Sequence, residues 1–297
     1  MQLFYDTDKP IRGDFLRRAV LRSDLVPVPL TLEADIRIDA ESGPFFAVGR
    51  SVHTYANDEL EIVKSEVVPS GRVQGATEAA YVRIVAILKP VKDVAFIKPY
   101  AIIKRGATLA QIYRAAGATL RGIEGDFSAS RYTCLVGEVP SYHISRALQE
   151  AGGVVRWRNG RLAFKSLSSL FDQNPVDVVP AGSSETLDSG FRERHEIPAF
   201  YSLDAGGGFV FGNRTKTRAI RFQQGASATT LRNMTSCLVV DRVSRFKYAP
   251  AIAAGDAMEV QGVGIRAVIT AASVFEAGTD GEAPQQYTKL WLGRLER

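Results

Sequence analysis

The 297-residue chain contains only two cysteines, Cys134 and Cys237, and only three histidines. The two cysteines are far apart in the sequence, and each has apolar neighbours. No cluster of cysteine and histidine has the spacing of a structural zinc site. We therefore expect both cysteines to be buried thiols, and we predict no metal site and no cofactor.

A catalytic motif is also missing around the histidines. None of His53, His143 and His195 has a serine, cysteine or carboxylate partner at the spacing of a known motif. A catalytic triad would have to be assembled entirely by tertiary contacts. His143 falls on a predicted short helix, where a surface or packed position is expected. We predict no catalytic residue and infer that the protein is not an enzyme.

Two glycine-rich segments match nucleotide-binding motifs only by their letters. The segment 262–267 has the spacing of a dinucleotide fingerprint, but a strand pattern follows it where the fingerprint needs a helix. The segment 207–212 has the spacing of a phosphate loop, but Asn213 stands where the lysine is required. We interpret Gly262 and Gly264 as turn glycines between strands.

Long apolar runs and a strong charge imbalance are absent. No run approaches the roughly 18 residues of a membrane span, and the charged N-terminal segment does not resemble a signal peptide. We expect a soluble protein, made in the cytoplasm. The net charge of +5 permits contact with nucleic acid without implying it. Arg214, Lys216 and Arg218 alternate along one predicted strand, which indicates either a contact surface or a solvated strand face.

Residues 1–95 have the pattern of a β-domain. Apolar and polar residues alternate from Leu30 to Ile38, as in a half-buried antiparallel strand. Extended patterns follow at 45–52, 60–68 and 80–88. Glu33, Asp35 and Asp39 share the polar face of the first strand with Arg37. This mixture of charges favours a solvated or partner-facing surface over a metal or acid–base site.

Residues 96–171 predict a small α+β module. Thr108 and Gln111 form a capping box that begins one short helix, and Gly117 follows its end. A second helix begins at 140–141 and ends before the glycine pair 152–153. An Asn159-Gly160 turn then joins two strands in a hairpin.

The predicted hairpin has one apolar and one basic face. Val155, Trp157, Leu162 and Phe164 share the first face, and Arg156, Arg158 and Arg161 share the second. We expect the apolar face to pack as a small separate core and the basic face to be wet. The three arginines are therefore a candidate contact surface.

The rest of the chain predicts a connection and a second β-domain. Residues 172–196 are rich in proline, glycine, serine and charge, as in a long connection or arm. Residues 197–297 favour strands throughout, at 198–203, 208–211, 217–222, 236–243, 257–260, 264–272 and 286–295. The predicted fold is thus α+β, mostly β, with two β-domains and a small helix-bearing module between them.

This order of elements resembles the baseplate hub proteins of bacteriophage tails, a family that includes the late control protein D group and the hub part of VgrG spikes. The resemblance is carried by IIKRGATLAQIYRAAG, by LVGEVPSYHISRALQEAGGVVRWRNGRLAF and by YAPAIAAGDAMEVQGVGIRAVITAASVFE. It covers about half of the chain. It implies a homotrimeric ring in the tail baseplate of a virion, in which the two β-domains of each subunit are tube-type β-barrel-like domains that imitate six-fold tube symmetry.

The same resemblance implies the partners. These are a tail tube or distal tail protein on one side and a spike or tip protein on the other, with a tape-measure protein and DNA passing through the lumen as further candidates. Two other classes stay open at this point. One is a tail-associated cell-wall hydrolase, and the other is a basic nucleic-acid-binding protein that uses Arg214, Lys216 and Arg218.

Overall fold

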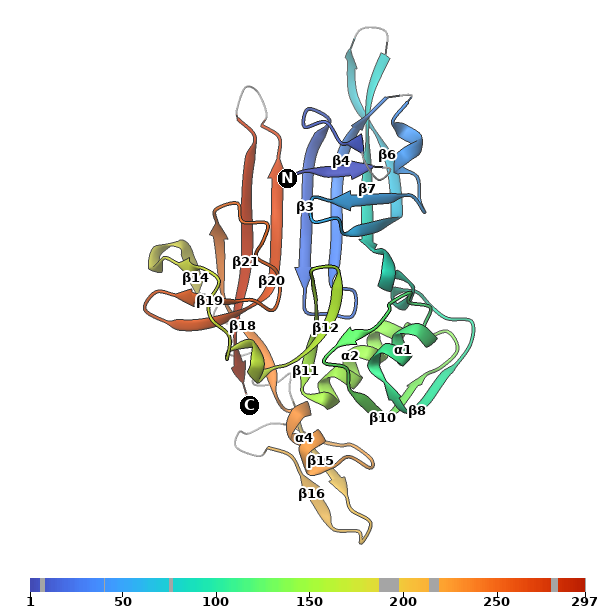
Figure 1. Ribbon diagram of the computed structural model, residues 1–297, viewed down its shortest axis with the longest axis vertical. Helices are drawn as coiled ribbons and strands as arrows, with labels where there is room; N and C mark the ends of the chain where they lie inside the picture. Colours follow the sequence, from blue (N-terminus) through green and yellow to red (C-terminus); the bar gives the residue numbers. More distant parts are fainter. Residues whose placement is uncertain are drawn as a thin grey trace.

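The computed structural model describes residues 1–5, 9–39, 41–74, 77–186, 198–213, 219–278 and 283–296, apart from the side chains of residues 69–74 and 77–79. Strands dominate, helices are few, and the main sheet curls into a half-barrel (Figure 1). The predicted mostly β, α+β fold class is confirmed. No helix among the described residues is long and apolar enough to cross a membrane.

Within the described residues, one sheet contains thirteen strands and runs through both β regions of the chain. Its main path has the order β14-β18-β21-β20-β3-β4-β7-β6-β5-β1-β2, and β19 pairs with β20 and β13. The strands are β1 (Leu3–Tyr5), β2 (Lys9–Pro10), β3 (Leu16–Asp24), β4 (Leu30–Ile38), β5 (Ser51–Thr54), β6 (Glu59–Gln74), β7 (Thr77–Leu88), β13 (Val178–Val179), β14 (Ser184–Thr186), β18 (Cys237–Phe246), β19 (Ala257–Val260), β20 (Gly264–Glu276) and β21 (Gln285–Glu296).

The two β regions are joined by antiparallel pairing of β3 with β20. The register runs from Asp24 opposite Thr270 to Arg18 opposite Glu276. The Thr270 hydroxyl donates to Asp24, and the Ser23 hydroxyl accepts from the backbone N–H of Ala254 at 3.1 Å. Residues near the two ends of the chain thus form the middle of a single sheet. The predicted connection 172–196 contributes β13 and β14 to this sheet.

The predicted strand from Leu30 to Ile38 is β4, with the expected alternation of buried and exposed positions. The extended segment predicted at 45–52 is wrong in its first half, where a 3-10 helix spans Gly43–Phe46. Pro44 lies in the first turn of this helix, where its fixed φ fits the helical conformation and its missing N–H needs no partner. Phe46 is buried and contacts Tyr5. Other 3-10 helices span Lys89–Ala95, Ser168–Leu170 and Ala181–Ser183.

The module 96–171 contains the predicted helices and hairpin. The elements are β8 (Ile102–Thr108), α1 (Leu109–Ala115), β9 (Ile123–Glu124), β10 (Ser128–Cys134), α2 (Pro140–Ala151), β11 (Gly153–Arg158) and β12 (Arg161–Ser166). The capping box at Thr108 is present, and Gly152 ends α2 with φ +68°. Asn159 and Gly160 both have positive φ, as the predicted two-residue turn requires.

The apolar face of the hairpin does not form a separate core. Val155, Trp157 and Leu162 belong to one cluster of buried residues that also includes the interior of the first β region. Tyr113 of α1 is fully buried, and its hydroxyl donates to the Pro27 carbonyl at 3.0 Å. The expected small separate core is therefore wrong, because the module buries its apolar face against the neighbouring sheet.

The first strands of the predicted second β-domain form a small sheet of their own. Its order is β16-β15-β17, from β15 (Ala199–Leu203), β16 (Phe209–Phe211) and β17 (Ile220–Phe222). A helix that the sequence analysis missed, α4 (Ala228–Met234), packs on it. The signal for this helix is Ser227, whose side chain accepts from the Thr230 N–H as an N-cap.

Gly293 on β21 offers a test of sheet packing. A Cβ at this position would lie 2.5 Å from the carbonyl oxygen of Val239 on the adjacent β18. We predict that Gly293→Ala lowers the free energy of unfolding by about 1–3 kcal/mol through overpacking. Urea denaturation measures this loss. The matched control is Gly13→Ala, since no atom lies within 4 Å of its Cβ position. Equal losses in both variants would contradict the prediction.

Candidate assembly surfaces and a side-chain cluster

Two arginines of the β11–β12 hairpin bind the loop that precedes β19. Arg158 Nη1 lies 2.9 Å from Asp256 Oδ2 and donates to the Ala251 carbonyl at 2.8 Å. Arg156 Nη1 donates to the Gly255 carbonyl at 3.2 Å and lies 3.8 Å from Asp256 Oδ1. Asp256 is only 4% exposed. We call Arg156, Arg158 and Asp256 the arginine–aspartate clasp.

Gly255 is the residue that lets the clasp close. It has φ +88°, and a Cβ there would lie 2.8 Å from Cδ of Arg156. A residue with a side chain would meet both backbone strain and a steric clash. The Gly255-Asp256 pair in the sequence is the signal for this loop, although its partner arginines cannot be identified without the fold.

The three arginines of the hairpin, which were predicted to form a contact surface, differ in their exposure. Arg156 and Arg158 are partly buried against the second β region, so the expected wet face is wrong for these two residues. Arg161 is exposed beside the turn. Contact of these three arginines with a partner protein stays a prediction. The other predicted interaction residues, Arg214, Lys216 and Arg218, lie outside the described residues.

The opposite face of the hairpin is tied to the first β region. Trp157 Nε1 donates to Asp58 Oδ1 at 2.7 Å. A pocket of 730 Å³ adjoins this contact and is lined by Leu21, Trp157 and Ile252, among other residues. The hairpin therefore contacts both halves of the large sheet, one through each face.

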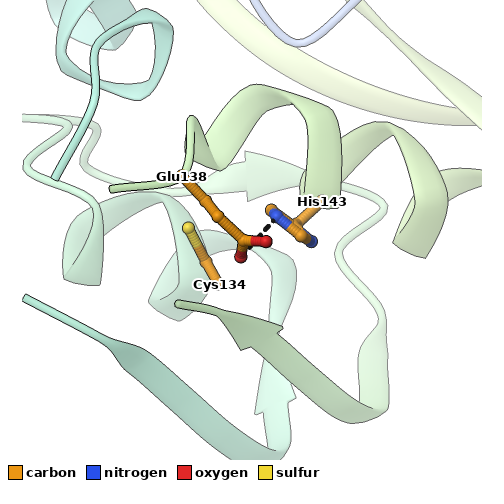
Figure 2. A group of neighbouring side chains, drawn as sticks. All are labelled: Cys134, Glu138 and His143. Carbon is orange, nitrogen blue, oxygen red and sulfur yellow. Dashed lines mark ion pairs between the residues drawn. The ribbon is translucent and has the colours of Figure 1, made fainter. Parts of the chain in front are cut away.

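Cys134, Glu138 and His143 come together between the end of β10 and the first turn of α2 (Figure 2). One potential ligand atom from each residue lies within 4.8 Å of the other two. His143 Nε2 is 2.9 Å from Glu138 Oε2, and the same oxygen accepts from the Leu135 N–H at 2.6 Å. The sequence analysis found no such cluster, because its spacing of three and four intervening residues matches no standard motif.

Burial raises the pKa of the Cys134 thiol above its usual range, and the Glu138 carboxylate raises it further. Cys134 is fully buried, as expected, but Cys237 is only half-buried, so that expectation is wrong. His143 is half-buried and lies edge-on to the rings of Tyr132 and Tyr142, in agreement with the expected surface or packed position. His53 is also buried, and His195 lies outside the described residues.

The three carboxylates of the β4 region have separate roles. Asp35 is bound by Arg83 at 2.9 Å, and Asp39 accepts from the Ser42 hydroxyl at 2.7 Å. Glu33 lines a hollow of 530 Å³ across β3, β20 and β21, where Arg22 and Lys289 are also found. The mixed charges of this hollow agree with the predicted solvated or partner-facing surface. Gly262 and Gly264 both have positive φ in the β19–β20 turn, as predicted.

The small sheet β16-β15-β17 exposes an apolar face at one end of the molecule (Figure 1). Tyr201 pairs with Phe211 on one side and Phe222 on the other, and Leu203 pairs with Phe209. Phe209 is 67% exposed and Phe222 is 50% exposed. The opposite face is covered by α4. We call the face that contains Tyr201, Leu203, Phe209, Phe211 and Phe222 the aromatic face.

Comparisons with known proteins place this fold. No protein-family model matches the chain, and no curated protein matches its sequence. Solved structures do match over almost the whole chain. A tail protein from Neisseria meningitidis has a TM-score of 0.63 at 11% identity, with 99% of this chain and 95% of that chain covered. The chain has the fold of a tail protein.

Two further solved structures have a similar fold. The tail protein of prophage MuSo2 from Shewanella oneidensis has a TM-score of 0.64 at 11% identity, with 98% of each chain covered. An E. coli component of the type VI secretion system has a TM-score of 0.53 at 11% identity, over 92% of this chain and 73% of that chain. That protein is described as similar to tail proteins of bacteriophage T4. At these identities the likeness is one of fold.

Asp256 is the carboxylate that both arginines of the arginine–aspartate clasp share, so its removal tests the clasp. Asp256→Ala leaves two partly buried guanidinium groups without their carboxylate. We expect it to lower the free energy of unfolding by about 3 kcal/mol, the lower end for a broken buried pair, because Arg158 is partly exposed. Chemical denaturation measures this. Arg161→Ala, from the same hairpin, should change stability by less than about 0.5 kcal/mol. Similar losses in the two variants would refute the role of the clasp.

The hydrogen bond from Trp157 to Asp58 can be tested by removing its donor. Trp157→Phe keeps an aromatic ring but removes the N–H that the carboxylate accepts. We expect a loss of about 1.5 kcal/mol, as for a hydrogen bond to a charged group. The control is Trp291→Phe, since the half-buried Trp291 ring contacts the Lys289 ammonium, a contact worth only about 0.5–1 kcal/mol. A larger loss for Trp291→Phe would count against this assignment.

Proposed function

We propose that this protein is a structural component of a phage tail, namely the baseplate hub that joins the tail tube to a spike or tip as a homotrimeric ring. The observation that carries the proposal is the match in fold to tail proteins over nearly the full length of both chains. A match of this extent includes both β regions and the module between them. It therefore supports a role in the same kind of assembly.

The shape of the main sheet supports a ring. The sheet curls into a half-barrel and ends at the short strands β2 and β14. Exposed sheet edges are liable to pair with other chains, and closure into a ring protects them. With two β regions per subunit, three copies would supply six similar wall segments. This number matches the six-fold tube symmetry that the resemblance implies.

The aromatic face supports an assembly role over an enzymatic one. Phe209 and Phe222 are large apolar side chains that a lone soluble protein rarely gathers on one face. Such faces are covered by protein partners in assemblies. The mixed charges of the hollow lined by Glu33 and Lys289 suit a surface that meets water or polar partners. The proposed role is thus structural, within the virion tail.

Electron microscopy of the purified protein with its tube and spike partners tests the proposal. We predict class averages that show a ring of three subunits with a pseudo-six-fold outline. Analytical ultracentrifugation of the same mixture should give the mass of a trimer with its bound partners. A chain that stays monomeric in the presence of both partners would refute the hub function.

The same material tests the nucleic-acid-binding alternative. A nucleic-acid binder would lose affinity steeply with salt, by roughly one logarithmic unit of slope for each phosphate contact. The hub proposal predicts no such binding by the isolated chain. Tight, salt-dependent binding to DNA without ring formation would favour the alternative.

A further inference from the structure

We propose that Cys134, Glu138 and His143 bind one divalent transition-metal ion, with zinc as the expected occupant. The inference is independent of the proposed function, because it rests on the side chains shown in Figure 2. The three residues supply one sulfur, one oxygen and one nitrogen ligand atom. All three are types that zinc binds in proteins.

The distances require only a small rearrangement. The three ligand atoms lie within 4.8 Å of one another, and Glu138 Oε2 and His143 Nε2 are 2.9 Å apart. A tetrahedral zinc ion, with bonds of about 2.0–2.3 Å, places one sulfur and two lighter ligand atoms about 3.3–3.5 Å apart. The sulfur must therefore approach by at most about 1.3 Å, and the Glu138 and His143 atoms must separate slightly, which changes of side-chain torsion provide.

The surrounding backbone holds the ligands in place. Cys134 pairs with Ile102 at the end of the β8–β10 ladder. The turn that carries Glu138 is fixed by Lys98, whose N–H donates to the Glu138 carbonyl at 3.2 Å and whose carbonyl accepts from Gly137 at 2.9 Å. His143 lies in the first turn of α2, where the Tyr132 hydroxyl donates to the Pro140 carbonyl at 3.2 Å. A site on fixed elements needs little ordering when the metal binds.

The ligand set selects among metals. A thiolate and an imidazole favour zinc and its transition-metal neighbours over magnesium and calcium, which prefer oxygen ligands. Binding replaces the Cys134 thiol proton with a metal–sulfur bond and releases that proton to solvent. The Lys98 ammonium is nearby and would oppose a cation, but it is paired with Asp93 at 3.8 Å. Three protein ligands leave a fourth position for water or a partner's side chain.

The test uses the full chain after chelation, titrated with Co²⁺ in place of zinc. We expect one ion per chain, a sulfur-to-cobalt charge-transfer band and the visible absorption of tetrahedral cobalt. Added zinc should remove both signals. Cys134→Ser should abolish the charge-transfer band, and His143→Gln and Glu138→Gln should each weaken binding at least tenfold. Cys237→Ser is the matched control and should leave the titration unchanged.

Three results would overturn the proposal. One is the absence of a charge-transfer band in the unaltered protein at micromolar cobalt. Another is a band that persists in Cys134→Ser or disappears in Cys237→Ser. The third is unchanged affinity in both His143→Gln and Glu138→Gln. Because Glu138 and His143 are partly exposed, their variants are expected to fold even if Cys134→Ser does not.

Discussion

The antiparallel pairing of β3 with β20 joins residues that are far apart in the chain, since Asp24 and Thr270 are separated by 246 positions. Every other part of the main sheet lies on one side or the other of this ladder. β3 continues into the sheet of the first β region, and β20 continues into that of the second. The half-barrel shape, and with it the likeness to tail proteins, depends on this contact. Bringing together two strands this far apart in the chain costs loop-closure entropy, which grows only with the logarithm of the loop length and which packing on both sides of the ladder offsets.

The hairpin of the module strengthens this junction from outside the sheet. Its arginine face binds Asp256 of the second β region, and its apolar face packs on the first, with Trp157 donating to Asp58. A module inserted between two β regions thus also fixes their relative position. For a proposed ring subunit this matters, because an error in the angle between the two regions would be repeated in every copy and would prevent closure.

The surfaces that remain free after folding suit an assembly protein. α4 covers only one face of the small sheet and leaves the aromatic face exposed, and the mixed-charge hollow lies across β3, β20 and β21. The cysteine–glutamate–histidine cluster lies at the start of α2, and its His143 lines a hollow of 780 Å³ together with Phe222 of the aromatic face. The β3–β20 pairing that joins the two β regions is therefore distinct from the surfaces that are available to partners.

The sequence by itself determined the local elements. Alternation set β4, the Thr108 capping box set the start of α1, and Asn159-Gly160 set the hairpin turn, because each depends on neighbours within a few residues. The helix after Ser227 was missed, although its capping signal is equally local. Only the tertiary structure decided that two β regions form one sheet, that Arg158 binds Asp256, and that Cys134 meets its two neighbours. These contacts depend on side chains and strand edges brought together by folding, and no local pattern encodes such partners.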